Sequence, residues 1–224
     1  MTEKLILHEY SASGNCYKVR LTAAHLGLPL ERREYDILKG ETRTPEFLSR
    51  VNANGRIPVL QVGDRFIPES NAACLYLADG SDLIPADRFD RADMLRWMFF
   101  EQYNHEPNIA TMRFWLAYVG EEKLSEAQRG QMPAKRAAGE AALELMDEHL
   151  ADRRFFVGDR LSVADIALYA YTHVAEEGAR RQMLVHQPQR HPARLALRRQ
   201  LRPLRGAQPL LAHGRDPEAH PGDI

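Results

Sequence analysis

The order of the elements expected over residues 5 to 26 constrains the fold most: a short strand, a tight turn and a helix. Leu5-Ile6-Leu7 is an apolar segment typical of a buried strand. Val19, Ala23 and Leu26 recur at helical spacing and predict one apolar helix face. The turn between them, residues 11–15, consists of small and capping residues that suit a helix N-terminus. Free N–H groups and the positive end of the helix dipole meet there, so the turn is a candidate anion site.

The chain up to residue 78 continues as a small α/β unit. Its remaining elements are predicted to be a strand around residues 33–37, a short helix from Pro45, a hairpin of residues 57–62 and 65–68, and a helix over residues 71–77 capped by Ser70. The resulting order, βαβ followed by ββα, indicates one α/β domain over residues 1–78.

The second half of the chain shows no strand pattern. A turn-rich linker is expected over residues 79–90, followed by an all-α domain over residues 91–179. Helical patterns begin near Met94, continue past Pro107, and recur over residues 134–150 and from residue 161 onward. Ser162 and Asp165 form a capping box ahead of an apolar run, which predicts a helix buried at the centre of this domain.

Composition favours an ordinary globular protein. Apolar residues make up 44%, charged residues 27%, and the net charge is −1, which gives no general reason to expect nucleic acid or an anionic membrane as a partner. No apolar run approaches a spanning helix, and the N-terminus is too short and charged for a secretion signal. Two cysteines are too few for a disulfide framework, so we expect a cytoplasmic protein.

Five separated motifs, in order, resemble the cytosolic glutathione transferases, and specifically bacterial members with a serine or threonine in the active site. They are SGNCYKVRL from residue 13, NGRIPVL from 54, PESNAACLYLA from 68, WMFFEQYNHEP from 97 and LSVADIALY from 161. The resemblance implies an α/β thioredoxin-like N-terminal domain and an all-α helical C-terminal domain. It also implies a homodimer that uses glutathione as co-substrate.

The resemblance assigns thiol activation to the first turn. A free thiol has a pKa of ~8.5, so hydrogen bonds to the sulfur at a helix N-terminus would favour the reactive thiolate. Ser13 matches the activating hydroxyl of the serine or threonine members, with the Asn15 amide as a second donor to the sulfur. Ser11 is the alternative hydroxyl.

The same resemblance implies a binding site for the rest of glutathione. Ile57-Pro58 resembles the family's cis-proline turn, which leaves the Ile57 backbone free to pair with the cysteinyl unit. Glu69 would face the ammonium group and Ser70 would bind the carboxylate of the γ-glutamyl unit. Arg56 and Lys39 are candidates for the glycyl carboxylate.

A small apolar electrophile would bind between the domains, near Tyr103 and Arg113. The expected reaction is addition of the thiolate to that electrophile, with reduction of hydroperoxides as a further activity. We expect no metal, because Ile109 stands where a zinc motif beginning at His105-Glu106 would need its second histidine.

Two other functions remain open. Cys16 near a helix N-terminus could carry out glutathione-dependent thiol–disulfide exchange. However, it shares a helical face with Val19 and Ala23, which favours a small buried apolar side chain. The third possibility is a non-catalytic binding module on the same fold.

Residues 180–224 differ from the rest of the chain. They contain 9 basic residues, all Arg, against 3 acidic ones, a local charge of 9 − 3 = +6, together with 6 of the 13 prolines and no aromatic residue. Three readings compete: a divergent folded cap, a basic disordered tail, or an out-of-frame end of a GC-rich gene. We favour the last two. Without interleaved aromatic residues, the segment gives little support for nucleic-acid binding.

Overall fold

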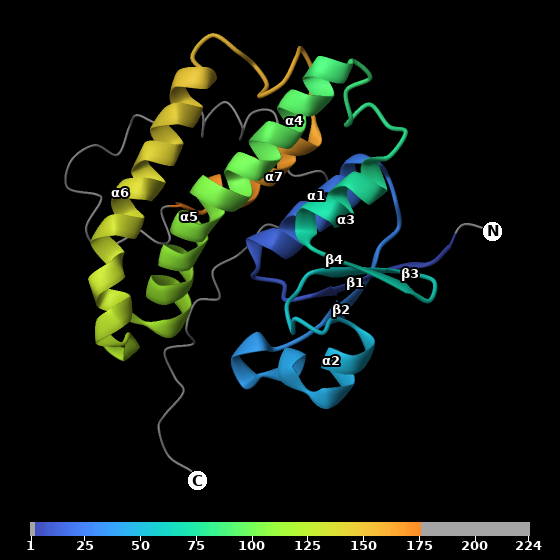
Figure 1. Ribbon diagram of the computed structural model, residues 1–224. Helices are drawn as coiled ribbons and strands as arrows, with labels where there is room; N and C mark the ends of the chain where they lie inside the picture. Colours follow the sequence, from blue (N-terminus) through green and yellow to red (C-terminus); the bar gives the residue numbers. More distant parts are fainter. Residues whose placement is uncertain (1–2, 176–224) are drawn as a thin grey trace.

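The computed structural model describes residues 3–175, which form a sheet half and a helical half around a shared core (Figure 1). Segment 180–224 lies outside the described residues. The sheet half comprises, in order, β1 (Leu5–Glu9), α1 (Gly14–His25), β2 (Glu31–Glu34), α2 (Pro45–Arg50), β3 (Val59–Val62), β4 (Arg65–Pro68) and α3 (Ser70–Ala78). The strand order is β2-β1-β3-β4, with β1 and β2 parallel and the other pairs antiparallel. This is the predicted thioredoxin-like arrangement.

Strand β2 lies earlier than the predicted residues 33–37. All four of its residues are exposed, so no apolar alternation marks its position. The strand stops because the Asp36 carboxylate accepts hydrogen bonds from the Leu38 and Lys39 N–H groups at 3.0 and 3.3 Å. These bonds begin a short 3₁₀ turn over Ile37–Lys39, which places Ile37 outside the strand.

Helix α3 begins at Ser70, which was predicted to be the cap that precedes the helix. Glu69 occupies the cap position with a φ of 71°, and its side chain makes no capping hydrogen bond. The Ser70 hydroxyl instead donates to Asn15 Oδ1 at 3.3 Å. Ser70 is therefore the first helical residue, and its side chain joins α3 to α1.

Strand register brings distant parts of the chain to one end of the sheet. His8 pairs with Val59, and Val59 pairs with Pro68. Consequently the turn that follows β1, the residues that precede β3 and the residues that follow β4 are neighbours. Ser13, Ile57-Pro58 and Glu69-Ser70 lie in these three segments.

The helical half contains α4 (Arg88–Phe100), α5 (Glu106–Arg113), α6 (Glu126–His149) and α7 (Val163–Thr172). Helix α4 starts inside the segment expected to be a linker, because the Asp87 carboxylate caps it. A π-helical turn, Glu101–His105, joins α4 directly to α5, as the predicted continuation past Pro107 requires. Helix α6 begins before the predicted residue 134, because Ser125 and Gln128 form a capping box.

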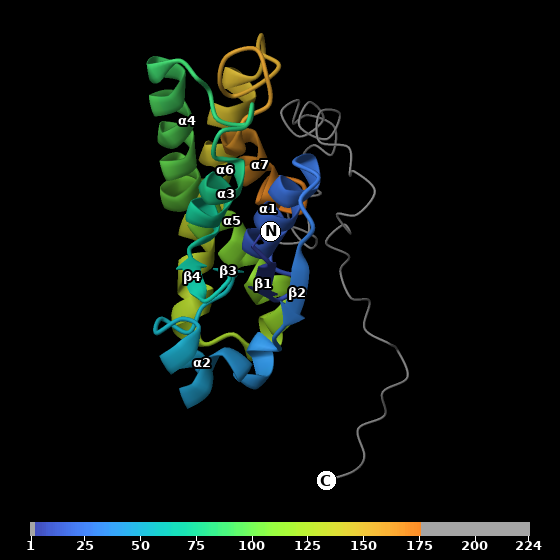
Figure 2. The same ribbon diagram turned by 90° about the vertical axis from the view of Figure 1, so that its right-hand side faces the viewer.

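Helix α7 is the centre of the molecule. All of its 10 residues are buried, and it contacts α1, α3, α4 and α5. Figure 1 shows α7 behind α4 and beside α1, with α1 and α3 between these helices and the sheet, and Figure 2 shows α7, α1 and β1 following one another from top to bottom. The predicted capping box of Ser162 and Asp165 is present at its start.

Within residues 3–175, none of the helices combines the length and the apolar character needed to cross a membrane.

Candidate active site

The Ser13 hydroxyl caps α1 and also faces a cavity. It accepts a hydrogen bond from the Cys16 N–H at 3.4 Å, which leaves its own proton free to donate. Capping and donation to a ligand are therefore compatible. Ser11 does not line this cavity. Its N–H donates to the Glu34 carboxylate at 2.6 Å and its carbonyl accepts from Arg20 at 2.9 Å, so Ser13 is the better placed of the two serines.

Asn15 connects both halves of the molecule through its side chain. Asn15 Nδ2 donates to Glu106 Oε1 at 3.3 Å, and Asn15 Oδ1 accepts from the Ser70 hydroxyl at the same distance. Asn15 was expected to donate to the sulfur through an amide; its backbone N–H donates to the Tyr171 hydroxyl at 3.3 Å. Neither Tyr171 nor Glu106 was identified from sequence as a site residue. Tyr171 stands within a helical pattern that looks like ordinary core, and Glu106 was considered only as part of a zinc motif.

The start of α3 offers a site for a carboxylate. The Ser70 side chain is buried, and the first N–H groups of a helix have no partner within the helix. Glu69 lies beside it on the surface. This pairing of backbone donors with an adjacent carboxylate suits a ligand group that carries both a carboxylate and an ammonium.

The Ile57–Pro58 peptide bond is cis, as the resemblance implies. The ladder between β3 and β4 begins at Val59, so Ile57 lies just outside it. Arg56 and Lys39 are exposed, and Lys39 pairs with Asp36 at 3.3 Å. The positive charge of Arg56 is the weakest of the influences that oppose the rise in the pKa of Glu106.

A cavity of about 250 Å³ lies between the first turn and the helical half. Arg113 lines it and is buried, with its guanidinium donating to the Ala12 carbonyl at 2.9 Å and to the Tyr118 hydroxyl at 2.6 Å. Tyr103 is not part of this cavity, since its side chain is 86% exposed on the π-helical turn. The lining consists of Tyr10, Ala12, Ser13, Ile37, Glu106, Ala110, Thr111, Arg113, Phe114, Tyr118 and Tyr171.

Glu106 gives the cavity wall a carboxyl group whose pKa is raised. Burial, followed by the charge of Glu101, raises the pKa of Glu106, while Lys18 and the hydrogen bond from Asn15 oppose that shift. A half-buried carboxylate favours a cationic or hydrogen-bond-donating neighbour.

Cys16 is fully buried, as its shared face with Val19 and Ala23 predicts. Burial raises the pKa of the Cys16 thiol to about 12. A thiol in this state is neither accessible nor ionised at neutral pH, which are the two conditions for thiol–disulfide exchange.

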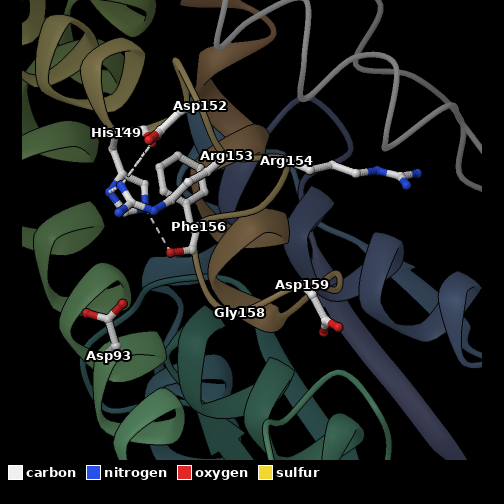
Figure 3. A pocket seen from close by; sticks show the side chains of 8 residues that line it. All are labelled: Asp93, His149, Asp152, Arg153, Arg154, Phe156, Gly158 and Asp159. Carbon is white, nitrogen blue, oxygen red and sulfur yellow. Dashed lines mark hydrogen bonds and ion pairs between the residues drawn. The ribbon is translucent and has the colours of Figure 1, made fainter.

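A second hollow of about 490 Å³ lies elsewhere, between α4 and the loop after α6 (Figure 3). There the His149 ring stacks on Phe156, and its Nε2–H donates to the Phe156 carbonyl at 2.9 Å. Asp93, Asp152 and Arg153 also line this hollow. None of the predicted site residues lines this hollow.

In the part of the chain that the structure describes, no cluster of three His, Cys, Asp or Glu side chains is suited to hold a metal ion.

Comparison with known proteins gives consistent matches. Residues 4–79 match the family model "Glutathione S-transferase, N-terminal domain", and residues 126–193 match "Glutathione S-transferase, C-terminal domain". The chain is 30% identical to glutathione S-transferase 2 of Anopheles gambiae over 163 residues, which are 70% of this chain and 74% of that protein.

Solved structures are similar over most of their length. The crystal structure of a glutathione S-transferase from Pseudomonas fluorescens has a TM-score of 0.81 and 40% identity, covering 92% of this chain and 98% of that one. A theta-class enzyme from Xanthomonas axonopodis, solved with glutathione bound, has a TM-score of 0.72 and covers 89% and 97% of the two chains. At 23% identity, the latter likeness is one of fold alone.

Proposed function

The chain belongs to the glutathione S-transferase family and is a glutathione S-transferase enzyme, and from this premise we propose that it activates the glutathione thiol for attack on small hydrophobic electrophiles. One observation carries the proposal: strand register gathers Ser13, the cis Ile57–Pro58 bond and Ser70 at one end of the sheet. Detoxification of such electrophiles, with reduction of hydroperoxides as a second activity, is the proposed use.

In this proposal each end of glutathione has its own partner. The γ-glutamyl carboxylate binds the N–H groups at the start of α3 near Ser70, and its ammonium faces Glu69. The cysteinyl backbone pairs with Ile57, and Arg56 and Lys39 lie on the side of the glycyl carboxylate. The sulfur then lies over the first turn of α1, where the Ser13 hydroxyl donates to it and stabilises the thiolate.

The electrophile is proposed to occupy the cavity of about 250 Å³ that adjoins Ser13. Its aromatic and aliphatic lining suits an apolar molecule, and Arg113 provides the one cationic wall among the lining residues. Tyr103, which was predicted from sequence to join this pocket, could reach an electrophile only from outside the described cavity.

Binding and turnover test the proposal together. Calorimetry of the full chain is expected to give heat of association with reduced glutathione, and 1-chloro-2,4-dinitrobenzene is expected to be conjugated by the bound thiol. Cumene hydroperoxide tests the peroxidase activity separately. Absence of both glutathione binding and conjugation would overturn the proposed function and favour the non-catalytic module.

The Cys16 alternative has its own test. Cys16→Ala is expected to leave kcat/KM for conjugation within about threefold of wild type, because the buried thiol takes no part in thiolate formation. Mass spectrometry after incubation with oxidised glutathione is expected to show no mixed disulfide at Cys16. A modified Cys16, or a large loss of activity in the variant, would support thiol–disulfide exchange instead.

Both cysteines are free, which fits the proposed action in the reducing cytoplasm.

We also propose that the enzyme is a homodimer joined through α3 and α4. Aromatic side chains are exposed on both helices and on the π-helical turn after α4: Tyr76 on α3 at 42%, Phe99 on α4 at 70% and Tyr103 on the turn at 86%. Exposed apolar side chains in such a group mark protein contacts more often than isolated ones do. A second copy of the chain is the proposed occupant.

The double substitution Phe99→Glu/Tyr103→Glu is expected to convert the dimer to a monomer, because it places charges in a desolvated interface. Sedimentation velocity measures the change. Leu145→Glu on α6 is the matched control, since Leu145 is also exposed but lies on another helix. A wild-type protein that sediments as a monomer would exclude this interface.

A further inference from the structure

A lysine with no exposed surface lies beneath Ser70. The Lys18 side chain is 0% exposed, and its Nζ atom is 2.8 Å from Glu101 Oε1, 3.4 Å from Ser70 Oγ and 3.5 Å from Asn71 Oδ1. An ammonium group has three N–H donors, and these three oxygens match them in number. The cation is thus enclosed by polar partners at the point where α3 begins.

The Lys18–Glu101 pair joins the two halves of the molecule. Lys18 belongs to α1, whereas Glu101 is the first residue of the π-helical turn that links α4 to α5. Glu101 is also 0% exposed, and its second oxygen accepts from Asn71 Nδ2 at 3.2 Å and from Gln102 Nε2 at 2.8 Å. Such single π-helical turns occur frequently at functional sites.

Stability alone is a poor reason for this arrangement. The desolvation of two buried charges offsets much of their attraction, and apolar pairs of similar volume are frequently as stable or more so. The position of the pair suggests a different role. The ammonium donates to the Ser70 hydroxyl oxygen, and the Ser70 hydroxyl in turn donates to Asn15.

A continuous chain of hydrogen bonds follows from that orientation. Lys18 donates to Ser70 Oγ, Ser70 donates to Asn15 Oδ1, and Asn15 Nδ2 donates to Glu106 Oε1. Asn15 is two residues beyond Ser13, in the same first turn of α1. The chain therefore connects the carboxylate-binding end of the site with the thiol-binding end.

We propose that Lys18, held in place by Glu101, is a positioning residue of the glutathione site: its buried ammonium group orients Ser70 and Asn15 and adds positive charge behind the place of the γ-glutamyl carboxylate. The inference rests on the proposed function, because it assumes that glutathione binds at this site. It assigns to Lys18 no contact with the reacting sulfur.

The double variant Lys18→Met/Glu101→Gln tests the role with no buried charge left unpaired. Calorimetry on the full chain would compare two probes, glutathione and γ-aminobutyryl-cysteinyl-glycine, which lacks only the α-carboxylate of the γ-glutamyl unit. The Kd for glutathione is expected to rise by about 10- to 100-fold, the size expected when a carboxylate loses one well-oriented hydrogen bond, here that of Ser70. The Kd for the analogue is expected to change little, and kcat at saturating glutathione less than KM.

Lys135→Met is the matched control, because Lys135 also bonds across helices, to the Pro107 carbonyl at 3.0 Å, but away from Ser70. Equal weakening of both probes in the double variant, or no weakening of either, would overturn the inference. If circular dichroism shows that the double variant is unfolded, Lys18→Gln/Glu101→Gln, which keeps polar side chains at both positions, replaces it with the same expected outcomes. Wild-type protein that binds neither probe would overturn the proposed function itself, whereas wild-type binding with an unaffected variant removes only Lys18.

Discussion

Replacing Ser13 with alanine is expected to raise the pKa of the enzyme-bound glutathione thiol by about 1–2 units, back toward the value of a free thiol. A hydrogen bond to a charged group contributes about 1.5–3 kcal/mol, and one pKa unit corresponds to about 1.4 kcal/mol. Because the thiolate is the nucleophile, kcat/KM for conjugation at neutral pH should fall by about 10- to 100-fold. Ultraviolet absorbance of the thiolate, titrated against pH with saturating glutathione, measures the shift directly.

Two companion variants separate thiol activation from helix capping. Ser13→Thr keeps both the hydroxyl and the ability to accept the Cys16 N–H, so it should retain a lowered thiol pKa. Ser11→Ala should leave the titration unchanged, because Ser11 does not line the cavity. If Ser13→Ala titrates like wild type and Ser11→Ala does not, the activating hydroxyl is Ser11.

Asp165→Ala should produce the largest loss of stability among single substitutions in the helical half. The buried Asp165 carboxylate accepts from the Ser162 N–H at 2.8 Å, the Ser162 hydroxyl at 2.7 Å and the Phe156 N–H at 2.9 Å. Removing it deletes a helix cap and leaves buried N–H groups without partners, at an expected cost of about 3–5 kcal/mol. For a protein of this size the melting temperature should fall by roughly 10 °C or more.

Ser125→Ala at the start of α6 is the matched control, because it removes the same kind of capping box from an exposed site. It should cost only about 1 kcal/mol. Calorimetric melting of the two variants beside wild type makes the comparison. Similar losses in both would mean that burial of the α7 cap adds nothing to its strength.

Much of the fold could be predicted because neighbouring residues specify where its elements begin. Thr44 accepts from the Phe47 N–H and Pro45 occupies the first position of α2, as local chemistry predicts. The capping box of Ser162 and Asp165 and the β3–β4 hairpin followed from the same kind of short-range signal. β2 was misplaced because its four exposed residues carry no apolar pattern.

For the site, local patterns and family resemblance marked the individual candidates but not their arrangement. Ser13, the Ile57–Pro58 bond and Ser70 were named from motifs, yet the register of β1, β3 and β4 brings them to one end of the sheet. Tyr103 was grouped with the electrophile pocket because helical spacing alone does not say which face of a helix meets solvent.

By itself the sequence determined the family, the two-domain architecture and the helix starts at Pro45 and Val163, where neighbouring residues form recognisable caps. Only the tertiary structure decided that the Asn15 N–H meets Tyr171, that Ser13 rather than Ser11 faces the cavity, and that Lys18 is buried against Glu101. The reason is physical. Capping and periodicity act over a few residues, whereas the contact between Asn15 and Tyr171 spans 156 positions and forms only when α7 packs against α1.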